Sequence, residues 1–148
     1  MSFYIFLSGA CSYYLYQRNG RFTSPGFPYR YSNNQHCTWS IEAPYGYYIN
    51  LQFGSFNLES GYDWVEIFDG SSAYSTRIKR ESDRRPSWEV CSSGRFLFVK
   101  FTSDGSVSYS GFSATYRVVP RGKETFVTTY PFAFVKTYFF SRNQCLST

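Results

Sequence analysis

The sequence is poor in the residues on which catalysis and transition-metal binding usually depend. Its 148 residues include one histidine, His36, and one methionine. The four cysteines form no CxxC pair, whereas a structural zinc site needs four cysteine or histidine ligands in close local pairs. No GxSxG, HExxH or phosphate-binding glycine motif is present. The sequence therefore predicts neither a zinc site nor an enzyme.

Long apolar runs and concentrated charge are also lacking. No run of 18 apolar residues occurs, so the sequence predicts no transmembrane helix. Charged residues make up only 17% of the chain, and the formal net charge is +5. This mild excess falls short of the concentrated basic stripe of a nucleic-acid-binding protein.

Aromatic residues, in contrast, are abundant at 23%, with 16 Phe, 15 Tyr and 3 Trp. Aromatic residues favour strands. In four segments, apolar and polar residues alternate with a period of two, which is typical of half-buried strands. A fifth segment, 95–101, is more evenly apolar and fits a central strand. The four alternating segments are 38–43, 47–53, 64–68 and 112–118. Turn motifs rich in Gly, Pro, Asp and Ser lie between them, and no segment has a helical period with a cap. The pattern predicts an all-β, antiparallel two-sheet sandwich.

The two ends of the chain differ from this pattern. Residues 1–10 hold a short apolar stretch that fits a signal-peptide remnant, a fragment start or a first strand. Residues 119–148 form an aromatic C-terminal extension, interrupted by Pro131, that fits an added strand or the start of a following region. The even number of widely spaced cysteines favours disulfides, and therefore an oxidising, extracellular compartment.

Residues 11–118 carry a series of motifs in a distinctive order. The motifs are Cys11, NGRFTSPGFPYRY at 19–31, CTWSI at 37–41, INLQF at 49–53, FNLE at 56–59, YDWVEIFDG at 62–70, SSGRFLFVKFTSD at 92–104 and GFSATY at 111–116. Their order and spacing resemble the CUB domain family, the extracellular module of complement proteases, astacin-type metalloproteases and spermadhesins. The resemblance implies a disulfide-stabilised sandwich with a Cys11–Cys37 bond, and a secreted calcium-dependent module for protein–protein interaction.

The resemblance also implies a calcium site built from three carboxylates. Glu59 follows the FxL motif, Asp63 lies in the YD motif, and Asp104 lies in the SD turn. Calcium prefers six to eight hard oxygen ligands, and the backbone carbonyl of Gly105 or Ser106 would add to the set. In the family, the same acidic group receives a lysine or arginine of an extracellular partner. In the alternative interpretation, Asp63 and Asp104 only cap turns, and Glu59 is solvated.

Several positions depart from the family pattern. The segment 59–63 is short and lacks a second family cysteine, and Asn19 stands where calcium-binding members often have a tyrosine. Val107 stands where an asparagine ligand is common. Cys91 and Cys145 are left with three alternatives, namely a bond to each other, bonds to another chain, or free thiols.

A second function is indicated by basic and aromatic side chains. The basic segment contains Arg77, Lys79, Arg80, Arg84 and Arg85. It is interpreted either as a patch for an anionic ligand such as a glycosaminoglycan or as a solvated loop between two strands. Tyrosines at 13, 14, 16, 45, 47 and 48 are candidates to contact a partner. The alternative function is therefore a carbohydrate- or glycosaminoglycan-binding adhesin-type module, and a third alternative is a purely structural spacer.

Overall fold

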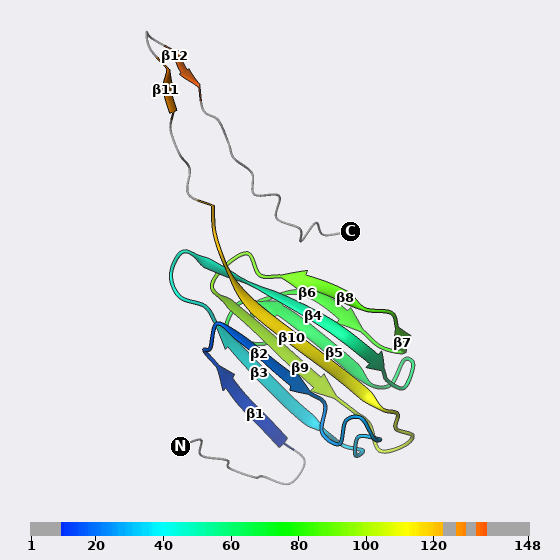
Figure 1. The fold of residues 1–148 in the computed structure, drawn as a ribbon. Coiled ribbons are helices and arrows are strands. Elements are labelled where there is room, and N and C mark those ends of the chain that lie inside the picture. The colour runs from blue at the N-terminus through cyan, green and yellow to red at the C-terminus, as the bar shows by residue number, and fades with distance from the viewer. Residues whose placement is uncertain (1–9, 123–126, 130–132, 136–148) are drawn as a thin grey trace.

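The structure is a computed structural model that describes residues 10–122, 127–129 and 133–135. Two five-stranded sheets lie against each other (Figure 1). The first sheet has the order β1 (Ala10–Leu15), β3 (His36–Glu42), β9 (Phe96–Thr102), β5 (Trp64–Asp69), β6 (Thr76–Glu81). The second has the order β2 (Asn19–Thr23), β10 (Gly111–Pro120), β4 (Tyr47–Asn57), β7 (Arg84–Arg85), and β8 (Trp88–Cys91) also pairs with β4. The predicted all-β sandwich is confirmed.

Alternation explains why these segments form strands. In β3, Cys37, Trp39 and Ile41 are buried and the residues between them are half-buried. Strand β9 repeats the pattern across the pair. All strand pairs in the two sheets are antiparallel except β1–β3, which is parallel. The disulfide Cys11–Cys37 joins two residues that face each other in that parallel pair.

The abundant aromatic residues form the core between the sheets. Phe112, fully buried on β10, contacts five other rings from both sheets, namely Phe22, Trp39, Phe53, Phe56 and Phe101. Burying a phenylalanine side chain contributes about 1.5–3 kcal/mol. The aromatic composition therefore stabilises the contact that holds the two sheets together.

The basic segment is a strand, so its interpretation as a solvated loop is wrong for residues 76–81 and 84–85. Strand β6 pairs with β5 at the edge of the first sheet, and the short β7 pairs with the end of β4. Edge strands of native proteins often carry lysine and arginine, which discourage pairing with another chain. The apolar periodicity of the sequence did not reveal this strand, because Ile78 is the one apolar residue in β6.

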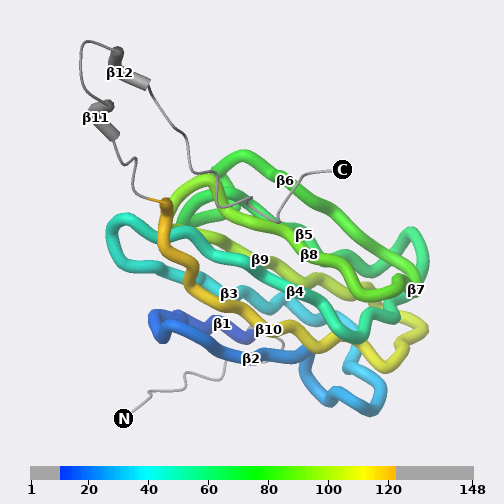
Figure 2. Tube along the Cα trace, turned by 45° about the horizontal axis from the view of Figure 1, so that its top comes forward, coloured from blue at the N-terminus to red at the C-terminus, as the bar shows by residue number. Residues whose placement is uncertain are grey.

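Three loops gather at one end of the sandwich, where Figure 2 shows the segments before β3, between β4 and β5, and before β10 close together. Hydrogen bonds join them: the Asn34 N–H donates to the Asp104 carbonyl at 2.7 Å, and the Ser103 N–H donates to the Gln35 carbonyl at 3.1 Å. Gly111 has φ +77°, and a Cβ at this position would lie 1.9 Å from Ser24 Oγ. Glycine is therefore required where the last loop enters β10.

The chain ends are described only in part. Strands β11 (Val127–Thr129) and β12 (Ala133–Val135) pair antiparallel with each other. Residues 1–9, most of the extension 119–148 and Cys145 lie outside the described residues. The candidate pairing of Cys91 with Cys145 therefore also lies outside them, and the division into segments 1–10, 11–118 and 119–148 stays a prediction. The described residues contain no helix with the length and apolar character needed to cross a membrane.

Candidate metal centre

Three carboxylates from two loops meet at this end of the sandwich. Glu59 follows β4, Asp63 precedes β5, and Asp104 follows β9. One carboxylate oxygen from each lies within 4.8 Å of the other two. Calcium–oxygen distances are about 2.3–2.6 Å, so two oxygens on one ion are at most about 5 Å apart. The three predicted residues are thus brought together at a spacing that fits one calcium ion.

The short segment 59–63 folds into a compact turn that brings two of the carboxylates together. The Asp63 N–H donates to the Glu59 carbonyl at 3.1 Å. The Ser82 hydroxyl donates to the same carbonyl at 2.8 Å and accepts the Gly61 N–H at 2.9 Å. The turn closes without the missing family cysteine, because Ser82 holds it from the adjacent chain segment.

Asp63 is the fully buried member of the group. Its Oδ1 accepts the Asp104 N–H at 2.9 Å, and its Oδ2 accepts the Tyr31 hydroxyl. A carboxylate offers about four lone-pair sites, so both oxygens keep the capacity to contact a cation. Because its partners come from distant parts of the chain, Asp63 does more than cap a local turn.

Tyr31 is a site residue that the sequence analysis missed. Its hydroxyl donates to Asp63 and accepts the Glu59 N–H at 3.1 Å. Burial, together with the hydrogen bond to Asp63, raises the pKa of this hydroxyl well above its ordinary value. Tyr31 therefore stays a proton donor at neutral pH. The one sequence signal was the position of Tyr31 at the end of the 19–31 motif. No neighbouring residue marks it as part of a site.

Asn19, in contrast, lies far from the carboxylates. It pairs with Arg117, which faces Asn50 on β4, whereas Asn57 lies at the other end of that strand. Seven residues of strand separate the two positions, which is about 23 Å. The absence of a tyrosine at position 19 therefore does not bear on this centre.

Asp104 caps a turn and also lies in the carboxylate group. Its Oδ1 accepts the Ser106 N–H at 2.9 Å, so it caps the turn at the start of the last loop. The same side chain takes part in the carboxylate group. The Gly105 carbonyl accepts the Asn33 side-chain amide at 3.1 Å, which ties the first loop to this turn.

The electrostatics of the group favour a cation. Glu59 Oε2 is buried and accepts no hydrogen bond from the described residues. Burial, followed by repulsion from Asp104 and Asp63, raises the pKa of Glu59. Glu59 as a whole is half-buried. A hard divalent cation would give the buried oxygen a ligand and remove the repulsion, so the residues present fit calcium.

The other predicted positions lie elsewhere. Among the basic side chains, Arg77 and Arg80 pair with Glu66, and Lys79 and Arg85 pair with Glu81. The remaining basic residue of the segment, Arg84, is exposed. Four of the tyrosines that were candidates for partner contacts are exposed, namely Tyr13, Tyr14, Tyr16 and Tyr45, whereas Tyr47 and Tyr48 are half-buried.

Comparisons with known proteins agree with this architecture. A sequence model of the CUB domain matches residues 11–116. Tolloid-like protein 1 of Homo sapiens is 34% identical over 110 residues, which cover 72% of this chain and 11% of that protein. The structure of the full extracellular region of zebrafish Gpr126/Adgrg6 is 32% identical with a TM-score of 0.68, covering 75% of this chain and 15% of that one. The MASP-1 CUB2 domain bound to Ca²⁺ is 25% identical with a TM-score of 0.63, covering 70% and 96% of the two chains. The chain thus spans only about a tenth of the relative's length.

Proposed function

The chain belongs to the CUB domain family, whose members are protein–protein interaction modules of extracellular proteins, and from that premise we propose a secreted, calcium-dependent interaction module. In this proposal Glu59, Asp63 and Asp104 hold one calcium ion and face a lysine or arginine of an extracellular partner. The observation that carries the proposal is the buried Glu59 Oε2, which has no hydrogen-bond partner among the described residues and lies beside two other carboxylates. A relative in the same family is known from a structure described as bound to Ca²⁺.

Charge arithmetic supports a basic partner residue. Three carboxylates carry a formal charge of −3 and the ion adds +2, so a group with calcium bound keeps a charge of −1. Lysine and arginine offer N–H donors and a positive charge to such a site. Calcium would also order the three loops before the partner arrives, which reduces the entropy lost on binding.

The calcium part is tested by thermal unfolding in millimolar calcium and in chelator. A ligand at free concentration c that binds only the native state raises the free energy of unfolding by RT ln(1 + c/Kd), which is about 0.4–1.4 kcal/mol at about 1 mM calcium for a Kd of about 10⁻³ to 10⁻⁴ M. We expect calcium to raise the Tm of the wild type and to leave the Tm of Asp104→Ala unchanged. The matched control is Asp69→Ala, which lies outside the carboxylate group and whose Tm should respond as the wild type does. An equal response of wild type and Asp104→Ala would reject the site.

The partner part is tested with a synthetic peptide that contains one lysine, compared with the same peptide acetylated at that lysine. Acetylation removes the charge and leaves the rest of the peptide intact. We expect the unmodified peptide to bind only in calcium and the acetylated peptide not to bind. Equal binding of both peptides in calcium would mean that the carboxylates do not receive a basic side chain.

The alternative function, binding of a glycosaminoglycan by the basic segment, receives less support. Glu66 accepts Arg77, Arg80 and also Lys100 within 4.0 Å, and Glu81 neutralises two further cations. These pairs lower the positive charge available to an anionic chain. Retention on a heparin column that falls with rising salt, and that Arg84→Ala weakens, would favour this function instead.

A further inference from the structure

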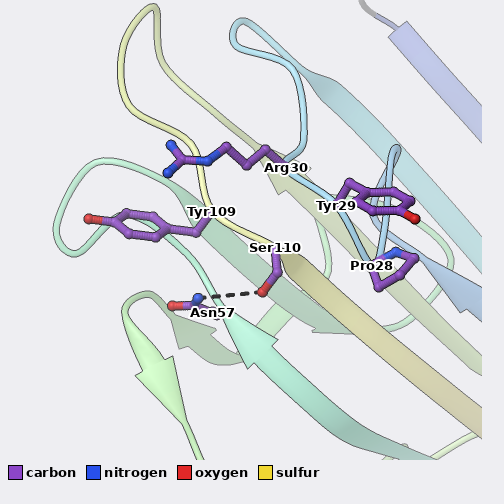
Figure 3. A pocket seen from close by; sticks show the side chains of 6 residues that line it. All are labelled: Pro28, Tyr29, Arg30, Asn57, Tyr109 and Ser110. Atoms are coloured by element: carbon purple, nitrogen blue, oxygen red, sulfur yellow. Dashed lines mark hydrogen bonds between the residues drawn. The ribbon is translucent and has the colours of Figure 1, made fainter.

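A pocket shown in Figure 3 shares no residue with the candidate metal centre. Its volume is about 620 Å³. The lining comes from the loop after β2, the last residue of β4 and the loop before β10, and consists of Pro28, Tyr29, Arg30, Asn57, Tyr109 and Ser110. The pocket is open to solvent, since Pro28, Tyr29 and Arg30 are all exposed.

The walls of the pocket are held in place by hydrogen bonds between its loops. Arg30 Nη1 donates to the Ser108 carbonyl at 3.0 Å, and the Tyr31 N–H donates to the Tyr109 carbonyl at 3.1 Å. Within the first loop, the Tyr29 N–H donates to the Gly26 carbonyl at 2.8 Å. A ligand would therefore meet walls that already lie in place, which lowers the cost of binding.

The charge of the lining is positive. Arg30 is its only ionisable residue of either sign apart from the two tyrosines, and none of the ion pairs in the described part of the chain includes it. One guanidinium N–H is engaged by Ser108, whereas a guanidinium has five N–H donors in a planar fork. The remaining donors suit a carboxylate, which arginine binds through two parallel hydrogen bonds.

The rest of the lining suits a sugar ring. Tyr29 is 80% exposed and Tyr109 is 40% exposed, so both rings offer open faces. Figure 3 shows Arg30 reaching out on the same side as Tyr109, with Tyr29 and Pro28 on the other side. Asn57 Nδ2 contacts Ser110 Oγ at 3.4 Å, which leaves the Asn57 carbonyl oxygen as an acceptor for a hydroxyl. Aromatic faces pack against the C–H faces of a pyranose, and amides and hydroxyls bind its hydroxyl groups.

We propose that this pocket binds a pyranose that carries a carboxylate, such as a sialic or uronic acid of an extracellular glycan. The carboxylate binds Arg30, the ring packs on the tyrosines, and Asn57 and Ser110 bind hydroxyl groups. A glutamate side chain of a protein would satisfy Arg30 but would leave the tyrosine faces and most of the volume unfilled. The assignment does not depend on calcium.

The test is saturation-transfer NMR and titration of the 1–148 chain with four probes. Sialyllactose and a glucuronic acid disaccharide carry the carboxylate, lactose lacks it, and N-acetylglutamate amide carries it without a ring. We expect binding of at least one acidic sugar in calcium and in chelator, and at least about tenfold weaker binding of lactose and of the glutamate derivative. Binding of sialyllactose would identify the ligand as a sialic acid, and binding of the glucuronic acid disaccharide would identify it as a uronic acid.

Variants locate the site. Tyr29→Ala removes an exposed ring, and Arg30→Lys keeps the charge but removes the fork. We expect each to weaken binding by about fivefold or more, because a lost hydrogen bond or ring contact costs about 1 kcal/mol. The Tm should be unchanged in Tyr29→Ala and slightly lower in Arg30→Lys, which also loses the hydrogen bond to Ser108. The control is Tyr74→Ala, whose fully exposed ring lies outside the pocket and whose loss should not affect binding. Absence of binding, lactose binding as tightly as the acidic sugars, preference for the glutamate derivative, or equal affinity of Tyr29→Ala would each overturn the proposal.

Discussion

Among single residues, Asp63 connects the fold to the candidate metal centre. It is fully buried and accepts hydrogen bonds from the Tyr31 hydroxyl and from the Asp104 N–H. Its side chain thereby joins all three loops at this end of the sandwich. Loss of its charge should therefore affect both the stability of the protein and its affinity for calcium.

We predict that Asp63→Asn lowers the free energy of unfolding by about 1–3 kcal/mol in chelator, because a buried hydrogen-bond partner is lost. The same variant should lose its response to calcium. Urea unfolding with and without calcium measures both effects. Asp69→Asn is the control, because Asp69 accepts only the Ser93 N–H at an exposed position. Wild-type stability of Asp63→Asn would show that these hydrogen bonds do not hold the loops.

Val107 is a second residue at which a substitution is informative. Here the structure predicts a gain of stability and of calcium affinity rather than a loss. The φ of Val107 is +39°, and it is 50% exposed in the loop that follows Asp104. A β-branched residue at positive φ costs roughly 1–3 kcal/mol, whereas asparagine tolerates this region. We predict that Val107→Asn raises the Tm by several degrees and increases the calcium affinity by adding an amide oxygen near the carboxylates.

Val107→Gly separates these two effects, because glycine relieves the backbone and adds no ligand. Thermal unfolding in chelator reports the backbone effect, and the calcium-induced shift reports the ligand effect. A lower Tm for Val107→Asn in chelator would contradict the assignment of strain at this position. An equal calcium response of the two variants would contradict the ligand role.

The individual residues of the candidate metal centre show how much of it could be predicted from the sequence. Glu59, Asp63 and Asp104 stand at recognisable positions of family motifs, and they do lie together. Tyr31 was not predicted because its role depends on two loops meeting across 28 and 32 residues of sequence. Asn19 was counted as a departure from the calcium-binding pattern for the same reason, since only the strand register shows that it lies at the other end of the sandwich.

At the scale of elements, β5 and β6 form the charged edge of the first sheet. Glu66 on β5 lies at the centre of a group of cations and contacts Arg77, Arg80 and Lys100. Although burial acts to raise its pKa, the hydrogen bond from Arg77 and the charge of Lys100 hold the pKa of Glu66 below its ordinary value. The edge strand is therefore tied to its neighbour through this glutamate.

The lowered pKa of Glu66 determines how its contribution to the free energy of unfolding depends on pH. A carboxyl with a lowered pKa in the native state stabilises the protein above its unfolded pKa, and the stabilisation disappears as the pH falls through the native pKa. We predict that Glu66→Gln lowers the free energy of unfolding at pH 7 by at most about 1 kcal/mol, and that the difference from wild type vanishes in acid below the native pKa of Glu66.

Urea unfolding between pH 3 and 7 measures the Glu66 effect. Glu89→Gln, at the exposed residue of β8, is the control and should show no comparable loss at pH 7, because a glutamine oxygen still accepts the Asn50 amide. A difference between Glu66→Gln and wild type that persists unchanged in acid would mean that packing, rather than charge, explains the loss.

Period-two alternation predicted four elements and an evenly apolar run predicted a fifth, because each has a buried face, but neither pattern predicted β6 or β7. Their side chains are mostly exposed at a sheet edge, so no apolar period marks them. Strand β1 (Ala10–Leu15) was not predicted either, because the first-strand alternative concerned residues 1–10 and the parallel pairing of β1 with β3 depends on a contact distant in sequence. Burial on one face is therefore the property that made an element predictable from this sequence.

At the scale of the whole molecule, the Cys11–Cys37 disulfide ties the edge strand β1 to β3 over 26 residues. Closing a loop of this length stabilises a protein by about 3–4 kcal/mol on the chain-entropy account. We predict that the double variant Cys11→Ser, Cys37→Ser loses about this amount in urea unfolding. An unchanged midpoint would show that the Cys11–Cys37 bond adds nothing to the stability of the sandwich.

The candidate metal centre and the proposed pocket lie at one end of the molecule. The carboxylate group and the Arg30 pocket lie on the same set of loops, and Tyr31 joins them through its hydroxyl on one side and its N–H on the other. The charged edge at β6 is a separate surface. An interaction module of this design would contact its partner with the loop end, where negative and positive groups are neighbours.

The most direct test of the central claim is calorimetric titration of calcium into the 1–148 chain and into Asp63→Asn at pH 7. The account predicts one calcium ion per wild-type chain, with a Kd of about 10⁻⁴ to 10⁻³ M, as in extracellular modules, and no measurable binding to the variant. Absence of binding to the wild type, or equal binding to both proteins, would contradict the assignment of Glu59, Asp63 and Asp104 as the calcium ligands.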